Sequence, residues 1–281
     1  MTVCAKNRIV KRCCTGQFRV AQFERQGEPG ALEQLQAIKG KTVGQRAART
    51  GSRRKGVSKV ASERVFRFED ILAERSKDRS LPKRTRTHYL ILAIVARHLN
   101  ADPARPPTVE LLLDEAGLSR GTFYNHFKDM DDCMAVLVGL FLETITVRGT
   151  KSAAQKSSYD AILDTNLSFA RAYEANAGLY ALFSQLASRN LDLLRMRERL
   201  NADWVKRIVA VVSHRRSRDF GAEERSLFEG ELRILIAMTI ETLRERFVDR
   251  EAMLCHSFPT TDSLAIALSD IWHLTMKRYE K

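Results

Sequence analysis

Cysteine is scarce in this sequence, which holds five in 281 residues, at positions 4, 13, 14, 133 and 255. Their odd number and scattered spacing exclude a framework of paired disulfides, so we expect a protein of the reducing cytoplasm. Long apolar runs are also missing. The longest, from Tyr89 to Ala96, is far shorter than the ~20 residues that a membrane span needs. Basic residues interrupt every apolar stretch near the N-terminus, which excludes a signal-peptide core.

Residue arrangements that carry catalysis are missing as well. The sequence has no serine-nucleophile elbow and no His-Glu-x-x-His metal motif. The segment 40–42 ends like a phosphate-binding loop, but Leu35 stands where that motif needs its first glycine. Cys13 and Cys14 have no second ligand pair at metal spacing. We therefore expect no enzyme, no metal site and no cofactor.

Positive charge is abundant and lies at one end of the chain. The net charge is +13, and residues 1–86 alone hold 22 Lys and Arg against 8 Asp and Glu. The remainder of the chain holds 25 basic residues against 26 acidic ones. A polyanionic partner such as nucleic acid would explain this asymmetry, and a solvated basic tail would explain it equally well.

The first 80 residues read as a basic and largely flexible N-terminal extension. Residues 1 to about 60 lack apolar periodicity and are interrupted by glycine. A helix over 62–77 is indicated by Val65, Phe68 and Leu72, with Ser62 as its cap. One interpretation is that the extension follows DNA phosphates or enters a minor groove. The other is that it is a tail without a role, or in part the consequence of a misplaced start.

Every segment from Lys83 onward has the periodicity of a helix, and none alternates with period two over a useful length, so the predicted class is all-α. A proline-rich loop, NADPARPP, follows the first of these helices. The sequence predicts helices over 83–99, 109–116, 120–127, 131–148, 157–175, 177–188, 190–213, 222–248 and 261–279.

Residues 108–127 have the pattern of two short helices joined by a sharp turn. Thr108 can cap the first helix, whose apolar residues recur at i, i+3, i+4 and i+7. Gly117 permits a left-handed turn, and Ser119 can cap the second helix. Phe123 and Phe127 lie one helical turn apart, so we expect both rings to point inward. This arrangement predicts a helix-turn-helix, which places its second helix in a DNA groove.

The stretch AGLSRGTFYNHF, residues 116–127, resembles the recognition turn and helix of the TetR family, the tetracycline-repressor-like regulators of transcription. The resemblance covers about residues 84–142. It implies an N-terminal three-helix DNA-binding domain over 81–130 and a C-terminal helical ligand-binding and dimerisation domain over 131–281. It also implies that DNA is contacted by Thr108, Ser119, Arg120, Gly121, Thr122, Tyr124, Asn125, His126 and Lys128.

One departure from the family pattern concerns the trailing edge of this motif. The family usually has a phosphate-contacting lysine at the start of the fourth helix, where this chain has Met130. Asp131 and Asp132 follow and would repel a DNA backbone, so either Lys128 substitutes or the contact is lost. The alternative to DNA binding is a helical hairpin within a core, which a cluster of tyrosine, asparagine and histidine fits poorly.

The apolar stripes of the last two predicted helices have two interpretations. The resemblance implies that helices 222–248 and 261–279 pair with a second copy in a four-helix bundle, whereas their apolar stripes alone indicate ordinary core. A pocket for a small-molecule effector can draw on six residues, although filling the core is the simpler role for any one of them. These candidates are Phe169, Tyr173, Tyr180, Phe183, Met196 and Trp204.

The leading hypothesis is a cytoplasmic, nucleoid-associated, dimeric regulator of the TetR type. It would bind a near-palindromic site in double-stranded DNA, most simply as a repressor, and a small molecule would release it. A second hypothesis gives the same DNA-binding head to a protein that responds to a protein partner or organises the chromosome. A third, an enzyme built on the C-terminal helices, finds no acid–base or metal residues in the sequence to support it.

Overall fold

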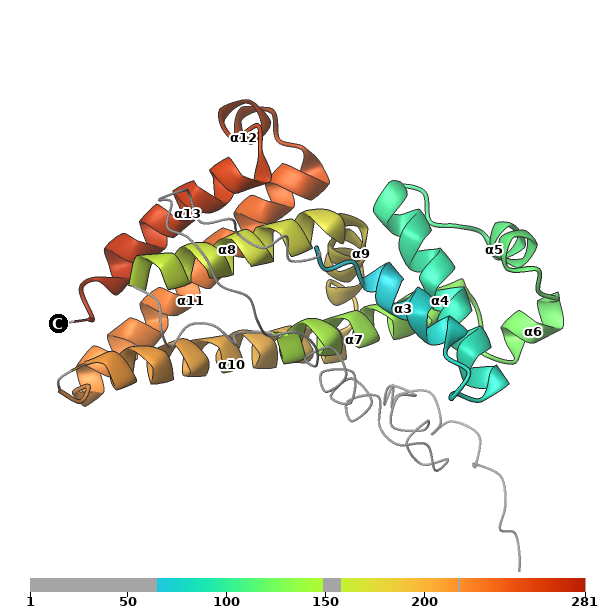
Figure 1. Cartoon of the computed structure of the whole chain (residues 1–281), viewed down its shortest axis with the longest axis horizontal. Helices are drawn as coiled ribbons and strands as arrows, with labels where there is room; N and C mark the ends of the chain where they lie inside the picture. Colours follow the sequence, from blue (N-terminus) through green and yellow to red (C-terminus); the bar gives the residue numbers. More distant parts are fainter. Residues whose placement is uncertain (1–64, 149–157, 217, 281) are drawn as a thin grey trace, which may run out of the picture. The chain divides into compact units, whose positions relative to one another are not determined.

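The computed structural model describes residues 65–148, 158–216 and 218–280, and its helices carry the labels of Figure 1. No strand occurs within these ranges, so the predicted all-α class is confirmed for them. The basic extension up to residue 64 lies outside the described residues. The elements are α3 (Phe68–Lys77), α4 (Lys83–Ala101), α5 (Val109–Ala116), α6 (Arg120–Tyr124), α7 (Met130–Arg148), α8 (Ser158–Ala175), α9 (Ala177–Ala187), α10 (Leu191–Arg215), α11 (Ala222–Arg244), the π-helical turn η3 (Glu245–Asp249), α12 (Ala252–Ser257) and α13 (Thr261–Met276).

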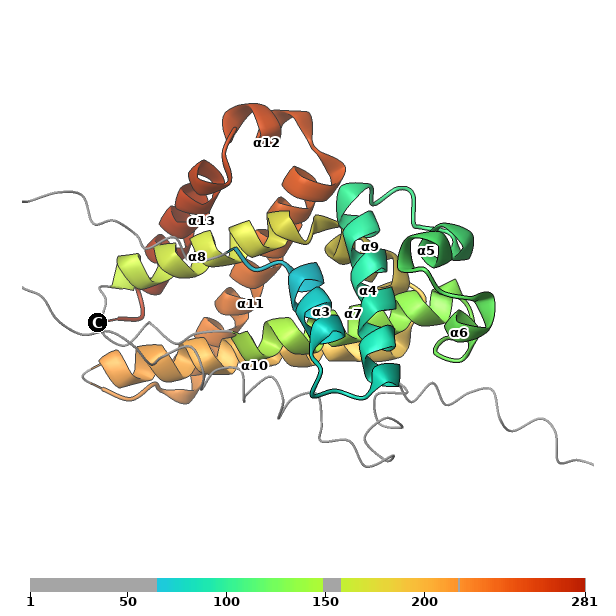
Figure 2. The ribbon, with the colours of Figure 1, turned by 45° about the vertical axis from the view of Figure 1, so that its right-hand side comes forward.

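Helix α3 packs along α4, as Figures 1 and 2 show, and begins later than the sequence predicts. The expected helix 62–77 starts at Phe68, and the part of it before residue 65 lies outside the described residues. Asn176 causes the late start. Its side-chain oxygen accepts a hydrogen bond from the Phe68 amide and its nitrogen donates to the Phe66 carbonyl, each at 2.8 Å. These bonds hold the backbone of Arg67 extended, so the helix cannot begin earlier.

The expected third helix, 120–127, is also too long, because α6 ends at Tyr124. The following residues must turn the chain into α7, whose start is fixed by two side chains. Asp129 accepts from the Asp132 amide at 2.8 Å, and Asp132 in turn accepts from the Lys128 amide at 2.9 Å. Asp129 thereby caps α7, and the helix before it is shortened.

Helix α9 lies between the two ends of the described fold, in contact with both α4 and α7. Asn176, which is fully buried, precedes it, and Gly178 in its first turn lies against the backbone of Leu99 and Asn100 in α4. A side chain at Gly178 would not fit there. The sequence therefore places asparagine and glycine where the chain needs a buried cap for α3 and a close helix crossing.

The C-terminal half is built from α8 alongside α13, a pairing visible in Figures 1 and 2, together with α10 and α11. One hydrophobic cluster joins α10, α11 and α13, with Phe228, Leu232 and Trp272 among its buried members. Helix α12 was not predicted. It has no buried residue, so no apolar face marks it, and Glu251 starts it by accepting from the amides of Met253 and Leu254.

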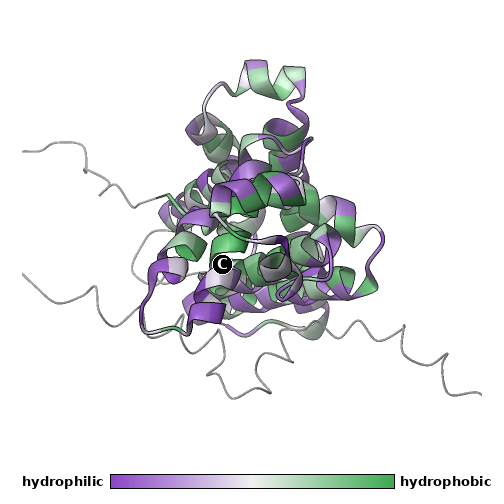
Figure 3. Cartoon of the chain, turned by 90° about the vertical axis from the view of Figure 1, so that its right-hand side faces the viewer, coloured by the Kyte–Doolittle hydropathy of each residue, from purple (hydrophilic) through white to green (hydrophobic). Residues whose placement is uncertain are grey.

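Figure 3 shows polar and apolar residues alternating along the helices, the pattern of surfaces that are half covered by neighbours. Among the described residues, no helix is long and apolar enough to cross a membrane. The fully buried large side chains include Phe68, Phe123, Phe127 and Phe141, which tie α3, α6 and α7 into the core around α4.

Candidate functional site

The turn between α5 and α6 has the local structure that the sequence predicts. The Thr108 hydroxyl caps α5 by accepting from the Leu111 amide at 3.2 Å, and the Ser119 hydroxyl caps α6 by accepting from the Thr122 amide at 3.3 Å. Gly117 adopts the left-handed backbone, with φ 62°. These three residues set the angle at which α6 leaves α5.

Two buried rings hold α6 on its core side. Phe123 and Phe127 are 0% and 1% exposed, which confirms that both point inward. The imidazole of His88, on α4, stacks on the Phe127 ring at 4.8 Å. The short helix is therefore fixed through its side chains, and its other face is left open.

The open face of α6 carries the residues that the sequence singles out. Arg120, Gly121, Tyr124, Asn125 and Lys128 are exposed, and Thr122 and His126 are half-buried. Tyr124 is 57% exposed, unusual for an aromatic ring beside two buried ones. The Arg120 guanidinium pairs with the Glu110 carboxylate of α5 at 2.9 Å, and both side chains are exposed. The face thus presents an aromatic ring, an amide and a cation on the surface of the described fold.

A shallow depression of about 390 Å³, called the basic depression below, lies beside this face. Its walls are Lys83, Arg84 and Thr87 of α4 and Thr122, Asn125 and His126 of the α6 region. The first turn of α4 contains no acidic residue. Cations at a helix N-terminus oppose the helix dipole, so their presence there costs stability unless an anion is bound. This signal was available in the sequence, yet the α4 residues were missed as site candidates.

His126 lines the basic depression, the ring of His88 lies 5.7 Å from the His126 ring, and both histidines are held neutral. Burial, followed by the nearby charges of His126 and Arg84, lowers the pKa of His88 to about 4. Burial and then Arg84 also lower the pKa of His126. The cationic character of the depression at neutral pH therefore comes from Lys83 and Arg84.

The trailing edge of the face is acidic, as the sequence indicates. The exposed Lys128 ammonium lies 3.8 Å from the Asp129 carboxylate, and Asp131 and Asp132 open α7. Met130 is the first residue of that helix and is half-buried. The lysine therefore stands among carboxylates rather than beside the basic depression.

A second concave site, the aromatic pocket, is enclosed by α7, α8, α9, α10 and α11 and has a volume of about 120 Å³. Phe169, Tyr173, Tyr180, Phe183 and Trp204 line it, as the sequence suggests, whereas the sixth candidate, Met196, does not. The helical period explains that correction, because Met196 lies next to the lining residue Arg197 and so points in a different direction.

The rings of the aromatic pocket are fixed by one another. Tyr173 and Tyr180 stack at 3.8 Å with nearly parallel planes, and Phe169 meets Trp204 edge to face at 5.1 Å. Burial raises the pKa of both tyrosines, so their hydroxyls stay protonated.

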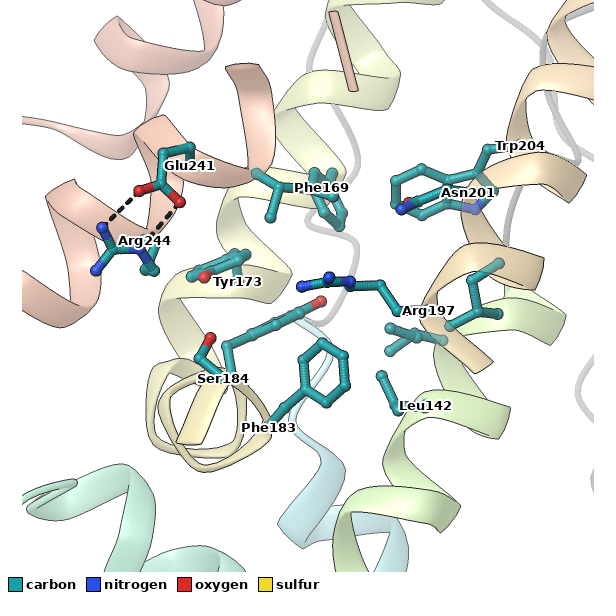
Figure 4. A pocket seen from close by; sticks show the side chains of 14 residues that line it. Leu142, Phe169, Tyr173, Phe183, Ser184, Arg197, Asn201, Trp204, Glu241 and Arg244 are labelled. Carbon is teal, nitrogen blue, oxygen red and sulfur yellow. Dashed lines mark hydrogen bonds and ion pairs between the residues drawn. The ribbon is translucent and has the colours of Figure 1, made fainter. Parts of the chain in front are cut away.

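The polar members of the pocket lining were missed in the sequence. They are Ser184, Arg197, Asn201, Glu241 and Arg244. In Figure 4 the Glu241–Arg244 pair lies on one side of Tyr173, and Arg197 and Asn201 approach from α10 on the other. In the sequence, those on α10 and α11 have the pattern of solvent-facing positions. Only the packing of the helices against one another turns them toward the pocket.

Apolar side chains also remain exposed on α11 and α13. Leu227 and Ile234, two helical turns apart on α11, are 61% and 68% exposed, and Leu274 on α13 is 70% exposed. The Arg278 guanidinium donates to the Glu231 carboxylate at 2.6 Å, which ties the residues after α13 to the middle of α11.

Other chemistry is limited in the part of the chain that the structure describes. It contains no group of three His, Cys, Asp or Glu side chains that could hold a metal ion. Cys133 is buried, and burial followed by the charge of Asp132 raises the pKa of its thiol, which makes it a poor nucleophile. No protein-family model matches this chain, and no curated protein matches it either.

Proposed function

We propose that this protein is a DNA-binding regulator of transcription of the TetR type, in which α5 and α6 form a helix-turn-helix and α6 is the recognition helix. The observation that carries the proposal is the open face of α6. It presents Arg120, Tyr124 and Asn125 to solvent on a helix whose opposite side is pinned by two buried phenylalanines.

The chemistry of this face suits the edges of base pairs. Asparagine pairs with adenine through two hydrogen bonds, and arginine does so with guanine. Arg120 must first leave Glu110, and an exposed ion pair of this kind contributes at most about 1 kcal/mol. A tyrosine at this position can contact a phosphate or a base methyl group. The missing side chain of Gly121 allows the sugar-phosphate backbone to approach.

The basic depression beside this face suits a phosphate. Lys83 and Arg84 supply positive charge, α4 begins after Pro82 without a side-chain cap, and Thr122 and Asn125 supply polar side chains. Phosphate contacts of this kind fix the register of a protein on a duplex, while the base contacts of α6 select the sequence. The depression takes the place of the lysine that the family usually has at Met130.

A second copy of the chain would cover the exposed apolar residues of α11 and α13. Leu227, Ile234 and Leu274 are large, exposed and close to one ion pair, Glu231–Arg278, that can form the rim of such an interface. A two-fold dimer sets two recognition helices about 34–36 Å apart and so requires a near-palindromic site.

A small-molecule effector in the aromatic pocket would act through α9 and α7. Helix α9 carries Tyr180, Phe183 and Ser184 on the pocket wall, and its first turn lies directly on the backbone of α4. Helix α7 carries Leu142 of the wall and begins six residues after the end of α6, at Met130. A ligand that displaces these two helices would change the spacing of the recognition helices and release DNA.

The proposal is tested by recovering genomic fragments bound to the full chain and measuring affinities for them. The double variant Arg120→Ala, Tyr124→Ala should lose at least about tenfold in affinity, because each specific contact contributes about 1–3 kcal/mol. Its melting temperature should stay that of the wild type, since both side chains are exposed. Arg195→Ala on α10, an exposed arginine beside Asp192, is the matched control and should bind as the wild type does. Unchanged affinity of the double variant would remove the assignment of α6.

A further inference from the structure

The polar side chains that line the aromatic pocket differ in whether they have partners among the described residues. Glu241 and Arg244 hydrogen-bond each other, with 3.0 Å between the arginine Nε and a carboxylate oxygen. The side chains of Arg197 and Asn201, in contrast, make no hydrogen bond or ion pair to any residue that the structure describes. They lie one helical turn apart on α10, so both turn toward the same space.

Asn201 is the more telling of the two because it is only 5% exposed. Its amide lies on the pocket wall in Figure 4, where a ligand can supply the hydrogen bonds that no described residue makes. The Arg197 side chain reaches inward between Phe169 and Phe183 in Figure 4, although the residue as a whole is exposed. A cation and an amide donor thus converge inside a pocket whose other walls are rings and aliphatic chains.

The charge around this space favours a single negative charge on the ligand. Arg244 pairs with both Glu241 and Asp249, so Arg197 is the lining cation that has no carboxylate partner among the described residues. Hydrogen bonds from Arg244 hold the pKa of Glu241 below its usual value, so that carboxylate stays ionised and opposes a dianion such as phosphate. A planar carboxylate fits a guanidinium through two parallel hydrogen bonds.

The volume limits the rest of the ligand. The pocket encloses about 120 Å³, and a cavity of roughly 150 Å³ in another protein holds benzene. The body of the ligand is therefore one ring or a short branched chain. Phe169, Phe183 and Trp204 are the apolar surfaces that would receive it.

We propose that the aromatic pocket binds a small apolar monocarboxylate, with its carboxylate on Arg197 and Asn201 and its apolar body against the rings. This assignment rests on the proposed function, in which such a molecule is the effector that releases DNA. It specifies the chemical class of that effector from the side chains that lack partners.

The test is calorimetric titration of the full chain with benzoate and 3-methylbutanoate as probes, and with benzyl alcohol as the uncharged analogue of benzoate. At least one acid should bind, and benzyl alcohol should bind about tenfold more weakly than benzoate. Arg197→Gln should weaken acid binding about tenfold or more and leave benzyl alcohol unchanged. Arg199→Gln removes the same charge from the same helix, but its guanidinium faces the Arg195 carbonyl at 3.4 Å, so acid binding should be retained.

Three results would overturn the proposal: neither acid binding at roughly 10 mM, acid and alcohol binding equally, or Arg197→Gln binding acids as the wild type does. The titration is independent of DNA, so the pocket and the proposed function fail separately. An acid that binds through Arg197 without changing DNA affinity would support the assigned ligand class and contradict release by an effector. Loss of DNA affinity on adding the acid supports both.

Discussion

Replacing Gly178 by alanine should loosen the contact between α9 and α4, on which the proposed coupling of the pocket to α6 depends. A Cβ atom at this position would lie 2.7 Å from the Asn100 nitrogen and closer still to the Leu99 carbonyl group. These are backbone atoms, so no rotamer change can relieve the overlap. The two helices must separate by roughly 1 Å to restore ordinary contact.

The cost of that separation can be bounded. Overpacking of a core costs about 1–3 kcal/mol, and a backbone-to-backbone overlap belongs at the upper end of this range. Alanine recovers about 1 kcal/mol through its better helix propensity. A net loss of about 2 kcal/mol lowers the melting temperature of a domain of this size by about 4–8 °C.

Thermal unfolding of the full chain, followed by circular dichroism, measures this loss. The control is Gly121→Ala in α6, where the added Cβ would meet only the Ser119 hydroxyl at 3.9 Å. This control should melt at the wild-type temperature or slightly above, because only helix propensity changes. Wild-type melting of Gly178→Ala would refute the close crossing of α9 and α4, and with it the proposed route of coupling.

Two further predictions concern pH and assembly. The pKa of His88 is lowered to about 4, so between pH 6.5 and 4 the unfolded state binds a proton that the folded state does not, and stability falls as pH falls through this window. The loss in the free energy of unfolding has an upper limit of about 3 kcal/mol. Urea unfolding at pH 7.5 and 5 measures it, and His88→Phe should remove most of it. An identical pH dependence in the variant would exclude His88 as the cause. Ile234→Asp should shift the full chain from dimer to monomer in sedimentation at micromolar concentration, because the charge would have to be desolvated in the interface. A dimer that persists in this variant would place the interface elsewhere.

Helices with a buried apolar face could be located from the sequence, and elements fixed by other means could not. The spans of α4 and α5 follow from apolar periodicity and from caps such as Thr108. The start of α3 depends instead on Asn176, which is more than a hundred positions away in the sequence. Helix α12 has no buried side chain, so periodicity gives no signal for it.

The same distinction applies to the candidate sites. Inward rings at positions 123 and 127 follow from helical spacing, because local geometry alone decides which way they point. The basic depression combines α4 with α6 and the residues that follow it, and only packing brings these segments together. The unpartnered pair Arg197 and Asn201 has the same origin, since polar residues on a long helix usually face water and here face a pocket.

The central claim is that the open face of α6 reads a DNA sequence, and one affinity ratio tests it most directly. Fluorescence anisotropy of the full chain should be measured with a recovered genomic fragment and with a scrambled duplex of the same length and composition, at one physiological salt concentration. Base contacts from two recognition helices predict a preference of about a thousandfold or more for the recovered fragment. Equal affinity for the two duplexes would mean that only charge attracts this protein to DNA, and it would contradict the account.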